Sequence, residues 1–236
     1  MLNLIGATVG MMAVAIDLVA FVSALLSSLS GRIMLAGIAG AWVGLATGLG
    51  AAGQFVFSPD QPVPLVGVFF AAPLVIVGAL AFASPRIRSA LVAVPMQLLI
   101  GLNALRMLGV LFLFLAAAGR LSGPFPYSAG WGDIITGAFA IPLALAVARS
   151  GSLPLGAVLL WNIFGTLDLV AAVTFGITSA AGSPLQLIHT GVGSEAMQHE
   201  PFCLVPTVLV PFYLITHGII FAQLARHRTL RVVTAG

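Results

Sequence analysis

Lysine is absent from the 236-residue chain, and cysteine occurs once, at Cys203. Without a lysine the chain cannot form a retinal Schiff base, so a rhodopsin-type chromophore is excluded. A single cysteine excludes an intramolecular disulfide and a thiolate-bound metal cluster. Charge is also scarce, because only 6% of the residues are Asp, Glu, Lys or Arg, against about a quarter in soluble domains. This composition excludes an ordinary water-facing surface.

Long apolar runs take the place of charge: 60% of the residues are hydrophobic, and the mean hydropathy is +1.16. Runs of about 20 apolar residues can cross a bilayer as helices, where each backbone group finds its partner within the helix. The alternating segments typical of an outer-membrane barrel are missing. We therefore predict an all-α, polytopic membrane protein with a single transmembrane domain over residues 1–236. Seven spans form its bundle, at about 3–28, 33–57, 64–83, 95–118, 132–148, 153–179 and 202–224.

The placement of the arginines predicts the orientation of the chain in the membrane. Arg120 lies on one side of the predicted membrane with Asp60, Glu195 and Glu200, and seven arginines lie on the other. Basic residues concentrate in cytoplasmic loops, so we expect the N-terminus outside and the C-terminus in the cytoplasm. The expected location is a bacterial cytoplasmic membrane, with lipid as a partner and no nucleic acid. The seven arginines are Arg32, Arg86, Arg88, Arg149, Arg226, Arg228 and Arg231.

Small residues and turn residues predict how the spans pack and connect. Gly40, Gly44 and Gly48 are four apart on one helix face, and Gly6 and Gly10 repeat this spacing. Such a seam lets helices approach closely, and we interpret it as packing within the bundle rather than as a dedicated dimer interface. A homo-oligomer and partner subunits both stay open. The segment at 84–89 reads as a turn, and the segment at 119–132 as a connection lying in the headgroup layer.

Three charged residues fall near the middle of predicted spans: Arg106, Asp17 and Asp168. A charge at this depth costs about 2.5–3.5 kcal/mol, so we expect these groups to compensate one another or to line a wet cavity. Arg106 can neutralise only one acid, which leaves the other protonated or paired with a bound cation. The alternative is a structural pair between Arg106 and Asp168, with Asp17 neutral and hydrogen-bonded.

Polar and aromatic residues accompany these charges at helical spacing. Asn103 precedes Arg106 by three residues, while Trp161 and Asn162 lie about two turns before Asp168. These residues are expected to line a polar pocket with the Trp161 ring as an apolar wall. His217, with Tyr213 one turn before it, lies in the cytoplasmic half of its span. His217 is a candidate for proton transfer to the inner surface, for metal or haem ligation, or for a structural hydrogen bond.

Two further groups of residues lie nearer the outer face. Asp133 stands at the start of a predicted span, where it would cap exposed amides; from there it could also reach the mouth of a cavity holding Arg106. Glu195 and His199 are four residues apart and, with His189, are weak candidates for a zinc site. They match no zinc signature, so we interpret them as a solvated loop.

The main functional hypothesis is a seven-helix bundle whose central cavity binds or transports a small solute or protons. Arg106 would hold an anionic group or act as counter-charge, Asp168 or Asp17 would take up the proton, and His217 would connect to the cytoplasm. One alternative is a redox or lipid-modifying membrane subunit that binds haem, quinone or a metal. Another is a non-catalytic sensor or partner subunit. No catalytic motif is present, so the sequence assigns neither catalytic residues nor a cofactor.

Overall fold

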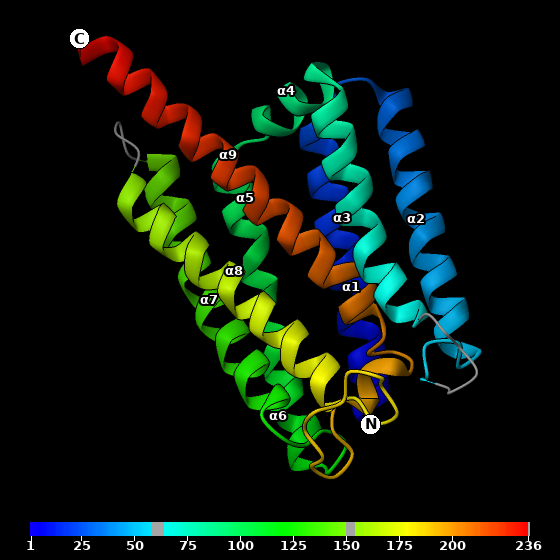
Figure 1. Cartoon of the computed structure of the whole chain (residues 1–236). Coiled ribbons are helices and arrows are strands. Elements are labelled where there is room, and N and C mark those ends of the chain that lie inside the picture. Colours follow the sequence, from blue (N-terminus) through cyan, green and yellow to red (C-terminus); the bar gives the residue numbers. More distant parts are fainter. Residues whose placement is uncertain (58–63, 150–153, 236) are drawn as a thin grey trace.

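A computed structural model describes residues 1–57, 64–149 and 154–235, with side chains as far as residue 227. Asp60 and the side chains of Arg228 and Arg231 lie outside this part. The described chain is helical, without strands, and has seven helical segments long and apolar enough to cross a membrane (Figure 1). The predicted all-α, seven-span architecture is thus confirmed. The segments are Leu2–Leu25 (α1), Leu29–Ala51 (α2), Leu65–Ala83 (α3), Met96–Ala117 (α5 to α6), Phe125–Arg149 (α7), Leu155–Ser179 (α8) and Val205–His227 (η3 and most of α9).

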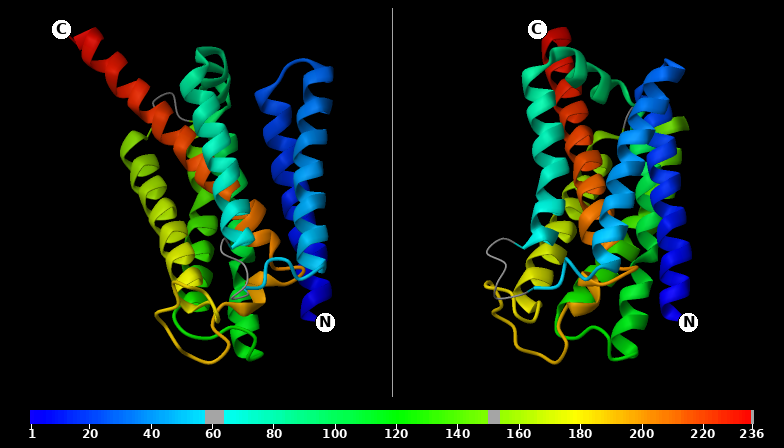
Figure 2. Two further views of the ribbon diagram at one scale, coloured as in Figure 1. Left: turned by 45° about the vertical axis from the view of Figure 1, so that its right-hand side comes forward. Right: turned by 90° about the vertical axis from the view of Figure 1, so that its right-hand side faces the viewer.

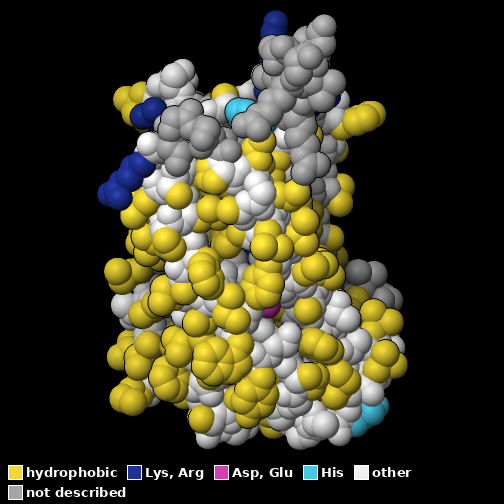
Figure 3. Space-filling model, turned by 90° about the vertical axis from the view of Figure 1, so that its left-hand side faces the viewer, with side chains coloured by type: hydrophobic (Ala, Val, Ile, Leu, Met, Phe, Trp, Pro, Cys, Tyr) yellow, Lys and Arg dark blue, Asp and Glu magenta, His cyan; other side chains and the backbone are white. Residues whose placement is uncertain are grey.

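The helices form one bundle with α1 and α2 on one side and α7 and α8 on the other (Figure 2). Helix α9 (Val210–Ala235) runs obliquely across the bundle, and the two chain ends lie at opposite ends of it. A π-helical turn, η3 (Val205–Leu209), precedes α9. On the face drawn in Figure 3, the basic side chains gather at the end where the C-terminus lies, and the surface between the two ends is largely apolar.

The fourth span is not one regular α-helix. It consists of α5 (Met96–Leu102), a 3₁₀ segment η1 (Asn103–Gly109) and α6 (Val110–Ala117). Side chains three residues apart eclipse in a 3₁₀ helix, so Asn103 and Arg106 project from the same side of η1. The break in regular helix therefore falls where the buried arginine is.

Two segments predicted as connections are helical. Residues Pro85–Ala93 form α4, which starts with proline at its first position, and the Ser84 hydroxyl accepts a hydrogen bond from the Ile87 amide. Helix α7 begins at Phe125, about seven residues before the predicted boundary, because Pro126 is tolerated in a first helical turn. Asp133 consequently lies more than two turns inside α7, so its prediction as a helix cap is wrong.

The tightest helix contact joins α7 to the fourth span through glycines. A Cβ atom at Gly137 would lie 2.7 Å from the Met107 backbone nitrogen, and one at Gly130 would lie 2.9 Å from the Leu113 side chain. The predicted packing seam of α2 is different, because Cβ atoms at its three glycines would meet nothing within 4 Å. That face points outward, and its interpretation as packing within the chain is wrong. The three glycines are Gly40, Gly44 and Gly48.

Candidate functional site

Arg106 is buried between two carboxylates, one from α7 and one from α8. Its Nε donates to Asp133 Oδ1 at 2.7 Å, and its Nη2 donates to Asp168 Oδ2 at 2.5 Å. The Arg106 side chain is only 1% exposed, against 16% for Asp133 and 6% for Asp168. We call these three residues the Arg106 cluster. With both acids ionised, it carries one negative charge in excess.

The other guanidinium nitrogen of Arg106 is also engaged. Nη1 donates to the Gly165 carbonyl oxygen at 3.2 Å and lies 3.1 Å from His217 Nε2. Arginine has five N–H hydrogens and no acceptor. Four of these hydrogens are directed to protein partners: one on Nε, two on Nη1 and one on Nη2. This arrangement suits a counter-charge for the two carboxylates better than a free site for an anion.

His217 is held in one tautomer by its neighbours. The guanidinium can only donate, so His217 Nε2 accepts, and Nδ1 carries the proton that it donates to Asn162 Oδ1 at 2.7 Å. The Asn162 amide in turn donates to the His217 carbonyl oxygen at 3.1 Å. Both ring nitrogens are thus used, and neither is free to ligate a haem or a metal in this arrangement. The geometry makes His217 a neutral positioning residue for Arg106.

Two other predicted site residues, Trp161 and Asn103, are hydrogen-bonded to backbone carbonyl oxygens near the cluster. The Trp161 indole donates to the Thr136 carbonyl oxygen at 3.0 Å, and its ring centre lies 5.3 Å from that of His217. Asn103 donates to the Leu99 carbonyl oxygen at 2.9 Å. Trp161 belongs to a closely packed core cluster and does not line either groove described below. It fixes the surroundings of the cluster and does not form the predicted pocket wall.

Two glycines make room for the cluster. A Cβ atom at Gly165 would lie 2.7 Å from His217 Cε1, and a Cβ atom at Gly132 would overlap the Asp168 carboxylate. Gly132 immediately precedes Asp133, so one short stretch of α7 supplies both a carboxylate and the space for the second one. The glycines flanking Asp133 in the sequence were the available signal for its role.

Asp17 is buried close by but does not contact Arg106. Its Oδ2 accepts a hydrogen bond from the Tyr213 hydroxyl at 2.9 Å, and its Oδ1 has no hydrogen-bond partner among the described residues. The Tyr213 ring lies between the two sites, with its centre 5.8 Å from Arg106 Cζ. Asp17 and Tyr213 therefore form a second polar site next to the cluster.

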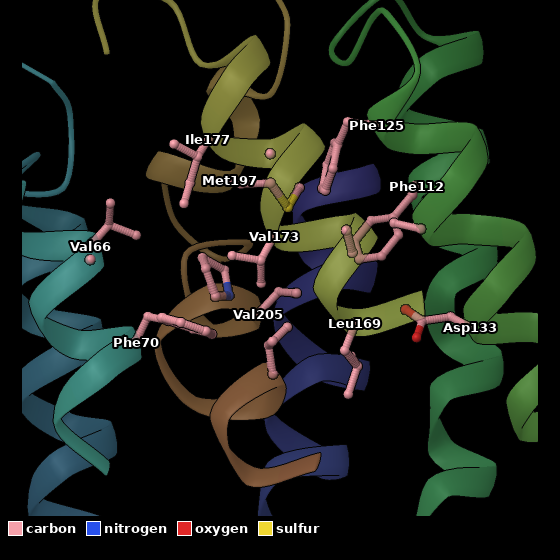
Figure 4. Close-up of a pocket in the computed structure, with 16 residues that line it drawn as sticks. Val66, Phe70, Phe112, Phe125, Asp133, Leu169, Val173, Ile177, Met197 and Val205 are labelled. Carbon is pink, nitrogen blue, oxygen red and sulfur yellow. The ribbon is translucent and has the colours of Figure 1, made fainter. Parts of the chain in front are cut away.

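Two grooves reach the cluster from the end of the bundle where the N-terminus lies. The first, which we call the apolar groove, spans about 660 Å³ including its open mouth, and Asp133 is the only charged residue among the described residues that line it. Figure 4 shows the Asp133 carboxylate directed into it, beside Leu169. The second groove, of about 640 Å³, shares Asp133 and is also lined by Arg106 and Tyr213. The apolar groove is walled by residues that include Val66, Phe70, Phe112, Phe125, Val173 and Met197, none of them anticipated as site residues.

A family model described as "Domain of unknown function (DUF8737)" matches residues 63–225 of the chain. The chain belongs to this family. The matched range contains all three residues of the Arg106 cluster, together with His217 and Asn162, whereas Asp17 lies before it. No curated protein and no solved structure matches the chain.

In this DUF8737 member, the loop candidates for zinc do not come together as a ligand set. His199 Nε2 lies 3.8 Å from Glu195 Oε1, and both side chains are about half exposed. Nowhere in the described part of the chain do three His, Cys, Asp or Glu side chains converge as a metal site would require. His189 accordingly does not join Glu195 and His199.

Proposed function

We propose that the protein takes up one proton, or one monovalent cation, at the Arg106 cluster and couples this uptake to binding or moving a small solute within the membrane. The observation that carries the proposal is the pairing of one buried guanidinium with two carboxylates. An uncompensated charge at this depth costs about 2.5–3.5 kcal/mol. One bound proton or monovalent cation removes that cost.

Access to the cluster supports exchange with a solute. Asp133 Oδ2 has no hydrogen-bond partner in the described part of the chain, and Asp133 lines both grooves. We propose that Asp133 is the exchanging acid, that Asp168 is the alternative site for the single proton while Arg106 stays the fixed counter-charge, and that Asp17 with Tyr213 is a neighbouring acceptor. With the N-terminus outside, as the arginine distribution favours, the grooves open toward the outer half of the membrane.

Infrared difference spectroscopy of the protein in lipid vesicles tests proton uptake directly. On a change from high to low pH, we expect a new carbonyl band from a protonated carboxylic acid buried in the bundle. Asp133→Asn and Asp168→Asn should each remove or shift this band, because either substitution neutralises the cluster without a proton. Asp17→Asn identifies any contribution from the second site, and Glu195→Gln, in the exposed loop, is the control. Spectra of Asp133→Asn and Asp168→Asn identical to wild type would contradict the proposal.

A further inference from the structure

The apolar groove combines a large hydrophobic wall with one acidic end. Residues of α3, α6, α7, α8 and α9 form it together with η2 and η3, and Asp133 is the only charged one among those that the structure describes (Figure 4). The free interior of the groove is about 110 Å³ and its mouth is open, so the groove encloses only part of a small organic ligand.

The sign of the charge at the closed end selects the ligand. The Arg106 guanidinium already donates to two carboxylates, a carbonyl oxygen and His217. A ligand in the groove therefore meets the free oxygen of Asp133 and the excess negative charge of the cluster, which disfavours an anion and favours a single positive charge.

Aromatic rings in the same groove as Asp133 point to an organic cation rather than a metal ion. Phe112 and Phe125 both line the groove, and their ring centres lie 5.7 Å apart with the rings tilted by 43°. Aromatic faces attract ammonium-type cations, and the attraction strengthens where water is excluded. A metal ion would need several oxygen ligands, and the lining offers one carboxylate.

We infer that the apolar groove binds a lipophilic monocation, a hydrophobic body with one ammonium-type or phosphonium-type centre. Its charged centre lies at Asp133, and its body lies along the α3 and α8 walls toward the rings of Phe112 and Phe125. The inference rests on the proposed function, because this ligand uses the same negative charge that a proton neutralises. Binding of the cation thus displaces the proton from the cluster.

Tetraphenylphosphonium and tetraphenylborate form a suitable pair of probes because they match in size and shape and differ in the sign of their charge. Calorimetry on the purified full chain in a nonionic detergent should show saturable binding of the phosphonium, at least tenfold tighter than that of the borate. About one proton should be released for each phosphonium bound. Asp133→Asn should weaken phosphonium binding at least tenfold.

A second pair of variants keeps the test informative if Asp133→Asn does not fold. Gly67 lines the groove on α3, and a Cβ atom there would meet nothing within 4 Å, so Gly67→Val narrows the groove without disturbing the cluster. Gly78→Val, on the same helix and outside this groove, is the matched control. Phosphonium binding weakened by Gly67→Val alone supports the inference. Equal binding of both probes, or affinity unchanged by both Gly67→Val and Asp133→Asn, overturns it. A pH-dependent carboxyl band that persists without phosphonium binding leaves the proposed function intact and removes only the ligand assigned here.

Discussion

Around the Arg106 cluster, the bundle packs differently in its two halves. This difference is confined to the region where α5, α7, α8 and α9 meet, because two further grooves lie along α3 and α9 toward the C-terminal end. Toward the C-terminal end, Leu99, Ile100, Val158 and Ile220 are fully buried in one continuous core with Trp161. Toward the N-terminal end, two grooves of about 660 and 640 Å³ reach Asp133. Around Arg106, the close-packed half holds the groups that orient the guanidinium, and the open half gives access to its carboxylates.

Gly132→Ala should lower the stability of the protein most, because it disrupts the Arg106 cluster at the boundary between the two halves. The added methyl group would overlap the Asp168 carboxylate, and breaking a buried ion pair costs about 3–5 kcal/mol. Thermal unfolding can be followed with a maleimide dye, since the only cysteine, Cys203, is fully buried. Gly48→Ala, which adds the same methyl group where nothing lies within 4 Å, is the control. Equal melting temperatures for the two variants would refute the steric argument.

A matched valine pair compares the two halves directly. Val158→Ala, in the close-packed core, should lower the free energy of unfolding by about 2 kcal/mol because the surrounding side chains leave a cavity. Val173 lines the apolar groove. Val173→Ala should lower the free energy of unfolding by about 1 kcal/mol or less, because the removed methyl groups already border open space. Denaturation of both variants in the same detergent measures the difference. A larger loss for Val173→Ala would show that the groove is not open space in the folded protein.

The smallest effect is a change in the pH dependence of stability. A folded cluster that holds a proton at neutral pH binds more protons than the unfolded chain, whose carboxylates ionise near pH 4. Stability must then fall as pH rises from about 4 to the pH at which the folded cluster releases its proton, by at most about 1.4 kcal/mol per pH unit. Asp133→Asn should flatten this slope in melting curves recorded across the pH range, with Glu195→Gln as control. A slope that survives in Asp133→Asn assigns the proton elsewhere.

Hydropathy was sufficient to predict the seven spans, and the shared depth of Arg106 and Asp168 was sufficient to suggest that they meet. Asp133 was predicted mainly as a helix cap, and its reach toward Arg106 was only the second interpretation. The residues before it, rich in Gly, Pro and Ser, read as a loop although α7 begins at Phe125. The 3₁₀ form of η1 coincides with its close packing against α7. Such tertiary contact has no local sequence signature. Spacing alone also could not tell that the glycine face of α2 points outward.

The π-helical turn at Val205–Leu209 connects the two halves within one continuous segment. Val205 and Val210 line the apolar groove at this turn. His217 lies further along the same segment and is hydrogen-bonded to Arg106. A π turn contains one surplus residue, and each residue accounts for about 100° of helical rotation. The surplus residue therefore sets the rotation of the groove wall at Val205 and Val210 relative to the helix face that carries His217.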